Sequence, residues 1–343
     1  MPPPKDSKKP KINYKIPRPS ASVILINPQN EVLLLHRVKT SSSFPSAHVF
    51  PGGNISSQDG DFPPAGHPDS HDEGIHYRRA AIREMFEESG ILLAKNKVTG
   101  EMVHVTAAER EEGRHAIHQN KITFDQWLKS KDPNAEPDTD PLVPFSHWIT
   151  PITNPRRFTT QMYLYFLPLA NESNASISAE IDDSNVQVPT SDGGLEITEA
   201  QFLPPSEWLA RARAGKIIMF PPQVMILTLV AQYLQRPGET VPISVQESAK
   251  RRAELLEFNF SGEIPWAYTF ISPRGIATLP DGRTIMDLSD PGPELKGSTK
   301  KGYMDRVTVS RFTKEGPKEV DVHYRSEIVG YLKAPKKAAK SAL

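Results

Sequence analysis

One short acidic segment constrains the fold of this chain more than any other part of it. Residues 83–91 read Arg-Glu-Met-Phe-Glu-Glu-Ser-Gly-Ile, and apolar residues recur at helical spacing from residue 80 onward. On such a helix, Glu84, Glu87 and Glu88 stand at positions i, i+3 and i+4, which share one side. The spacing therefore predicts three carboxylates on one face of an amphipathic helix.

These three carboxylates repel one another. Each pair of like charges at this spacing costs the helix about 0.2–0.5 kcal/mol unless a cation lies among them. Carboxylate oxygens are hard ligands that suit Mg²⁺ or Mn²⁺, and Mg²⁺ usually completes its shell with water and substrate phosphates. An ordinary solvent-exposed acidic helix face is the alternative interpretation. The surrounding residues must decide between the two.

The surrounding pattern mixes strands and helices and indicates an α/β fold. Two β-rich runs, residues 21–26 and 31–37, flank an Asn-Pro-Gln-Asn turn and predict a hairpin. A Phe-Pro-Gly-Gly turn follows at residues 50–53. Further strands are predicted at 158–167, 195–203, 306–312 and 319–324, and helices at 77–89, 106–129, 205–214 and 222–235.

The glycine turn and the acidic helix together resemble the Nudix box, the defining motif of the Nudix hydrolases. The resemblance rests on Phe50-Pro51-Gly52-Gly53 upstream and on the segment from Arg83 to Ile91 downstream. It implies an α/β/α Nudix sandwich with a mixed sheet, long insertions and a β-containing C-terminal extension. It also implies an enzyme that uses Mg²⁺ or Mn²⁺ to cleave a nucleoside diphosphate linked to another moiety.

The resemblance also implies roles for individual residues. Glu87 and Glu88 would bind the metal, and Glu84 would be a further ligand or support the metal-bound water. Arg83 would orient these carboxylates rather than take part in the chemistry. The residues of the turn expected at the substrate site are Phe50, Gly52 and Gly53.

The box of this chain is split by an insertion. Twenty-nine residues separate Gly53 from Arg83, far more than in the compact motif. The acid that the compact motif carries before the arginine is absent, because Ile75 stands at its position. Asp72 and Glu73 are the candidates to replace it.

The split box suggests one branch of the family. Together with Leu33-Leu34-Leu35-His36-Arg37, Trp148-Ile149-Thr150-Pro151 and Arg157-Phe158-Thr159-Thr160, it resembles the acyl-CoA diphosphatases over residues 18–235. That resemblance implies coenzyme A or an acyl-CoA as substrate, and 3′-phosphoadenosine 5′-phosphate and a 4′-phosphopantetheine as products. The coenzyme A signature of related branches is only partly present, since its basic and glycine residues are missing between Arg37 and Phe50.

If coenzyme A is the substrate, cationic side chains have to contact its phosphates. The candidates are Arg37, Arg157 and Lys39, because guanidinium and ammonium groups match phosphate oxygens. Glu196 or Glu199, shortly before Pro204-Pro205, is expected to supply a further acid used as base or ligand.

Two other functions stay open at this stage. A Nudix hydrolase of the same fold would act on ADP-ribose, NADH or an oxidised nucleotide, and kcat/KM values across these substrates would separate the two activities. A protein of another class would be a Nudix-fold nucleotide-binding or regulatory module without turnover. The three retained acids argue against the module, since a purely structural helix gains nothing from them.

Composition excludes several partners and compartments. Basic and acidic residues balance at 41 each, so no overall charge attracts nucleic acid or an anionic membrane. Cysteine is absent, which excludes disulfides and thiolate metal sites and fits an intracellular protein, whether peroxisomal, mitochondrial or cytosolic. The longest apolar run, residues 224–234, is too short to cross a bilayer.

The predicted organisation is one Nudix domain with additions. The segments are a basic tail over 1–17, the Nudix domain over 18–240, an extension with short strands over 241–330 and a basic tail over 331–343. The insertion 54–76 and a polar loop 171–194 interrupt the domain. In the insertion, residues 67–73 are rich in His and acids but are predicted as a solvated loop, because Pro68 opposes a helical metal-binding face.

Overall fold

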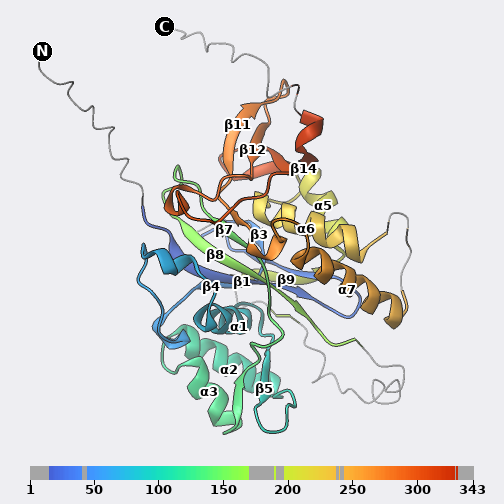
Figure 1. The fold of residues 1–343 in the computed structure, drawn as a ribbon. Coiled ribbons are helices and arrows are strands. Elements are labelled where there is room, and N and C mark those ends of the chain that lie inside the picture. The colour runs from blue at the N-terminus through green and yellow to red at the C-terminus, as the bar shows by residue number, and fades with distance from the viewer. Residues whose placement is uncertain are drawn as a thin grey trace, which may run out of the picture.

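The computed structural model describes residues 15–40, 45–169, 189–190, 197–236, 239, 243–328 and 330. Within these ranges the chain forms a large mixed sheet with helices on both faces, and a second, smaller sheet (Figure 1). The predicted tails and the polar loop 171–194 lie largely outside the described residues. No helix in the described part is long and apolar enough to cross a membrane.

Two long strands from distant parts of the chain form the centre of the main sheet. Its strands are β1 (Arg18–Ile26), β2 (Val32–Arg37), β3 (His48–Val49), β4 (Gly52–Asn54), β7 (Val143–Ile149), β8 (Phe158–Phe166), β9 (Ile197–Leu203) and β10 (Phe270–Ile271). Their order is β10-β7-β8-β1-β2-β3, with β4 paired to β1 and β9 paired to β2. β1 and β8 run parallel along their full length, and the predicted β1–β2 hairpin is confirmed.

Side chains of the central strands alternate between two apolar cores. In β1, Val23 and Leu25 pack into one core, whereas Ile24 and Ile26 pack into the other. Because both faces are covered, the strand reads as a continuous apolar run. Full burial of each such side chain contributes about 1.5–3 kcal/mol.

The two cores lie under two groups of helices (Figure 1). The first group is α1 (Ile75–Ser89), α2 (Ala107–His118) and α3 (Phe124–Lys131), and the second is α5 (Pro205–Arg213), α6 (Pro221–Leu234) and α7 (Val245–Phe260). The sheet with helices on both faces confirms the predicted α/β/α sandwich. α1, α5 and α6 confirm three of the predicted helices.

The region 106–129 differs from its prediction as one helical segment. It forms parts of two helices, α2 and α3, and each begins with its own capping box. The boxes are Thr106 with Glu109 and Thr123 with Gln126. A capping box satisfies the free N–H groups at a helix start, so the second box begins a new helix.

The insertion is more ordered than predicted. It contains two short 3₁₀ helices, η1 (Ser57–Asp59) and η2 (Pro68–His71). The prediction of a solvated loop is wrong for the end of η2, because His71 is buried and its Nδ1 lies 2.8 Å from Thr159 Oγ1. A two-stranded sheet of β5 (Ala94–Asn96) and β6 (Ala135–Pro137) lies further along the chain.

The C-terminal extension joins the main sheet and also builds the second sheet. α7, which the sequence pattern did not predict, packs its Leu255 into the core beside α6, and β10 pairs parallel to β7. The strands of the second sheet, in spatial order, are β11 (Arg274–Thr278), β12 (Thr284–Asp287), β13 (Arg306–Phe312) and β14 (Pro317–Tyr324). The two predicted strands in this region are confirmed. Short helices stand at η4 (Trp266–Tyr268), η5 (Pro293–Leu295) and η6 (Arg325–Ile328).

Candidate active site

The glycine turn and the acidic helix lie against each other, as the motif predicts. The turn forms β4, in which Gly52 adopts φ 155° and a Cβ there would stand 2.2 Å from the carbonyl oxygen of Ala21. A Cβ at Gly53 would stand 2.5 Å from the carboxyl group of Glu84. Gly52 therefore has to be glycine, because a side chain would meet the backbone of β1, and a side chain at Gly53 would displace the carboxyl group of Glu84.

Arg83 is the centre of a buried ion network. Its guanidinium donates to Glu84 Oε1 and to Glu87 Oε1, both at 2.7 Å. It also makes a bidentate pair with Asp59, with Nε to Oδ1 at 2.8 Å and Nη2 to Oδ2 at 2.9 Å. Nη2 further donates to the carbonyl of Asn54. The guanidinium thus joins the box helix to the insertion.

Asp59 is the acid that accompanies Arg83 in this split box. Only 2% of its side chain is exposed. The two acids that the sequence suggested for this place lie elsewhere: Asp72 pairs with Lys300 at 2.7 Å, and Glu73 pairs with Arg78 at 2.6 Å. The suggestion of Asp72 or Glu73 is therefore wrong for the position beside Arg83.

Glu88 is held between the glycine turn and β2. Its Oε2 accepts a hydrogen bond from the N–H of Gly52 at 2.8 Å, and its Oε1 lies 3.3 Å from Arg37 Nη1. Glu88 and Arg37 both line a cavity beside the helix. Gly52 thus orients the acid through its N–H while its missing side chain leaves the approach open.

Burial and neighbouring charges shift the pKa values of two groups in the network. Burial raises the pKa of Glu84 to about 7, although the charge of Arg83 partly opposes the shift. For Arg83, burial alone would lower the pKa, but Glu84, Asp59 and Glu87 outweigh it and hold the pKa above its ordinary value. Arg83 is therefore charged at every physiological pH. The pKa of Glu84 stays raised because the positive charge of Arg83 does not fully offset the burial of the carboxyl group.

The acids suit a hard divalent cation by their chemistry. Glu84 and Glu88 face the cavity, whereas one oxygen of Glu87 is taken by Arg83. Across the described ranges, no three His, Cys, Asp or Glu side chains gather into a ready metal site. The arrangement fits a cation held by Glu84 and Glu88, with water and substrate phosphates in the other positions, as Mg²⁺ commonly binds.

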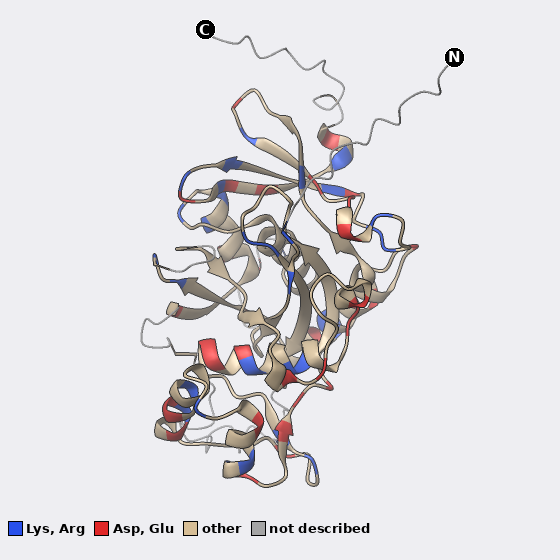
Figure 2. Cartoon of the chain, turned by 90° about the vertical axis from the view of Figure 1, so that its left-hand side faces the viewer, with Lys and Arg blue, Asp and Glu red and all other residues tan. Residues whose placement is uncertain are grey.

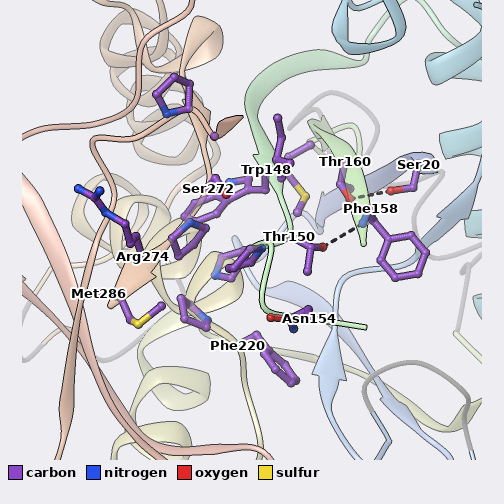
Figure 3. Close-up of a pocket in the computed structure, with 18 of the residues that line it drawn as sticks. Ser20, Trp148, Thr150, Asn154, Phe158, Thr160, Phe220, Ser272, Arg274 and Met286 are labelled. Carbon is purple, nitrogen blue, oxygen red and sulfur yellow. Dashed lines mark hydrogen bonds between the residues drawn. The ribbon is translucent and has the colours of Figure 1, made fainter. Parts of the chain in front are cut away.

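The cavity beside these acids has a volume of about 1370 Å³. Ligand sites for small molecules usually measure about 300–1,000 Å³, so there is room for a large substrate. Phe50, Gly52 and Gly53 of the turn line it. Figure 3 shows Ser20 and Thr160 of the central strands on one side of the cavity, and Arg274 and Met286 of the second sheet on the other.

Three other predicted site residues, Arg157, Lys39 and Glu199, are not part of the cavity wall. Arg157 is wrong as a phosphate ligand, because its side chain is fully buried and pairs with Glu294. Lys39 is exposed, and it is not part of the cavity wall. Glu199 is exposed on β9, opposite His36. Glu196 lies outside the described residues.

The sequence pattern did not predict two features of the site. Asp59 is not part of the box motif, because it stands 24 residues before Arg83, at the end of the short helix η1 in the insertion. The cavity wall from the C-terminal extension had no signal either. An acid followed by a glycine, Asp59-Gly60, was the one local hint of a fixed turn in the insertion.

Comparison with known proteins finds Nudix relatives. Residues 65–229 match the family described as the NUDT19 Nudix domain. The chain is 30% identical over 216 residues to "Putative nudix hydrolase 7" of Caenorhabditis elegans, covering 63% of this chain and 61% of that protein. It is 28% identical to "Acyl-coenzyme A diphosphatase NUDT19" of Xenopus laevis, covering 59% of this chain and 60% of that protein.

The chain is therefore similar to the Nudix hydrolases over the matched residues. Among them, the chain is similar to the NUDT19 branch, and it spans about three fifths of the length of these curated relatives. A crystal structure of a Nudix hydrolase from Alicyclobacillus acidocaldarius aligns with a TM-score of 0.49 at 22% identity, over 63% of this chain and 91% of that one.

Proposed function

We propose that this protein hydrolyses the diphosphate linkage of a nucleoside diphosphate derivative, and that coenzyme A or an acyl-CoA is its substrate. Water attacks one phosphorus, the P–O bond to the bridging oxygen breaks, and two phosphomonoesters leave. The products from coenzyme A are 3′-phosphoadenosine 5′-phosphate and 4′-phosphopantetheine. The observation that carries the proposal is the pair Glu84 and Glu88 at the wall of a cavity of about 1370 Å³, behind the glycine turn.

The size and the lining of the cavity support a long substrate. Its wall combines the acids of the box with apolar side chains such as Trp148, Ile152 and Phe220. An extended molecule with a charged centre and a less polar arm matches such a lining. The relatives named acyl-coenzyme A diphosphatase support the same choice of substrate.

The proposal gives each residue of the network a task. When bound, Mg²⁺ or Mn²⁺ would offset the charge of the diphosphate and make water more acidic. Glu84 and Glu88 would hold the cation, and Glu87 would contribute its remaining oxygen. Arg83 is too buried to reach the substrate, so it fixes the carboxylates of Glu84 and Glu87. Arg37, beside Glu88, is placed to contact a phosphate.

The test is a comparison of kcat/KM for coenzyme A, acyl-CoAs, NADH and ADP-ribose with Mg²⁺ or Mn²⁺ present. We expect coenzyme A or an acyl-CoA to give the highest value, with products identified by mass. Equal or higher values for the sugar nucleotides would overturn the substrate assignment. Binding without product from any diphosphate would indicate a regulatory module.

Glu88→Gln tests the site itself. The change keeps the shape of the side chain but removes the charge facing the cavity, so we expect kcat/KM to fall by about 100-fold or more. Glu112→Gln, on an exposed face of α2, is the matched control and should leave activity unchanged. A Glu88→Gln variant as active as the control would rule out this site.

A further inference from the structure

The two walls of the cavity differ in their balance of charge, although Arg37 lines it beside the box acids and Asp290 lines it on the side of the extension. The acids of its lining on the main sheet side are Glu84 and Glu88 of α1. Four cations, all from the C-terminal extension, line it elsewhere: Arg274, Lys296, Lys300 and Lys301. Figure 2 shows basic positions, with acidic ones between them, along the ribbon of the extension. The second sheet therefore does more than close the cavity.

Three of these cations have no carboxylate within hydrogen-bond distance among the described residues, so they can pair with an anionic ligand. Lys296 and Lys301 are exposed, and neither forms an ion pair with any residue that the structure describes. Arg274 lies 3.7 Å from Asp287 and 3.8 Å from Asp290, which is too far for hydrogen bonds. Lys300 differs, because it pairs with Asp72 at 2.7 Å.

Two cations of the second sheet and its turns that are not part of the cavity wall have close carboxylate partners. Arg283 pairs with Asp281 at 2.8 Å, and Arg311 pairs with Glu319 at 3.1 Å. Both pairs lie within hydrogen-bond distance. Among the described residues, Arg274, Lys296 and Lys301 thus lack a carboxylate within hydrogen-bond distance, whereas Arg283, Arg311 and the cavity-lining Lys300 each have one.

We propose that Arg274, Lys296 and Lys301 bind a second anionic group of the substrate, a phosphate remote from the diphosphate that is cleaved. This inference rests on the proposed function, since coenzyme A carries such a phosphate on its ribose. Lysine and arginine match phosphate oxygens, and several cations around one dianion share the task. The C-terminal extension then selects substrates that carry the additional phosphate.

The test compares coenzyme A with 3′-dephospho-coenzyme A, which differs only in that phosphate. We expect the native chain to prefer coenzyme A in kcat/KM. In the double variant Lys296→Ala/Lys301→Ala, the preference should fall by about five- to tenfold, because exposed charge pairs each contribute modestly. The loss should appear in KM for coenzyme A, with kcat and the melting temperature unchanged. Raising the ionic strength should shrink the native preference in the same direction.

Lys314→Ala is the matched control. This lysine is exposed at the turn between β13 and β14 and is not part of the cavity wall, so its removal should leave the preference intact. An equal loss of activity on both substrates in the double variant, or a native chain without preference, would overturn the inference. Hydrolysis of neither substrate by the native chain would instead count against the proposed function.

Discussion

The two walls of the cavity differ in how their charges are held. On the box wall, Arg83 is 4% exposed and donates to three carboxylates at 2.7–2.9 Å. On the wall from the C-terminal extension, Lys296 and Lys301 are exposed and Arg274 has only distant acids. The first wall has its geometry fixed before a ligand arrives, whereas the second gains its partners from the ligand.

This difference follows from what each wall has to do. A group that acts on a reacting bond must be positioned accurately, and buried hydrogen bonds provide that. A group that only retains a distant phosphate tolerates flexible contacts, and exposed lysines suffice for it. Substitutions in the box should therefore lower the free energy of unfolding strongly, and substitutions in the extension should lower it only a little.

Asp59→Asn should give the largest loss of stability. It removes the negative charge of a buried ion pair. Only Glu84 and Glu87 then remain as charged partners of the Arg83 guanidinium. We expect the free energy of unfolding to fall by about 3 kcal/mol, the lower end for broken buried pairs. Denaturant titration measures it. Asp61→Asn, an exposed acid of the same loop, is the control, and equal stability of the two variants would show that the box is not preorganised.

His147→Gln should have an intermediate effect that depends on pH. His147 on β7 stacks on Phe270 of β10, where the extension enters the main sheet. Burial, followed by the charge of His71, lowers the pKa of His147 from 6.5 to about 3. Between these pH values the unfolded chain binds a proton that the folded chain does not. Stability is therefore retained above pH 6.5 and is lost as the pH falls toward 3.

The loss should reach about 1.4 kcal/mol per pH unit for this single group. Glutamine does not titrate, so melting temperatures of the variant should fall less steeply between pH 6.5 and 4 than those of the native chain. His118→Gln, at an exposed position of α2, should leave the slope unchanged. If the melting temperatures of the native chain and of His147→Gln fell equally steeply with pH, the contact between β7 and β10 would not be the acid-sensitive part of the fold.

Arg213→Ala should have the smallest effect. Arg213 of α5 pairs with Asp321 of β14 at 2.9 Å, but 59% of its side chain is exposed. Exposed pairs contribute about 0.2–1 kcal/mol, so the free energy of unfolding should change within that range. Denaturant titration provides the value. A loss as large as that of Asp59→Asn would mean that the second sheet is held as firmly as the box.

The parts of the fold that the sequence predicted share a local cause. The hairpin, the box helix, α5 and α6 each carry their own periodicity, caps or turn residues. The glycine turn was also visible, because Gly52 and Gly53 are needed for close approach. Local chemistry of this kind can be read without knowing the neighbours.

The parts that the sequence did not predict depend on contacts across the chain. Asp59 becomes the partner of Arg83 only after the insertion folds back over α1. Arg157 looked like a phosphate ligand by its charge, but Glu294 from the extension pairs with it in the interior. Neither relation leaves a pattern in nearby residues. The same holds for the cavity wall that the extension supplies.

The two-residue strand β10 has a consequence for any shortened form of the protein. It pairs with His147 and Trp148 on the outer side of β7, a strand of seven residues that also contains the buried Phe145. A fragment ending near residue 240 would leave β7 as an open sheet edge with unpaired N–H and C=O groups. Such edges recruit strands from other molecules. Self-association of that fragment would thus arise from a missing strand, with every residue of the box intact.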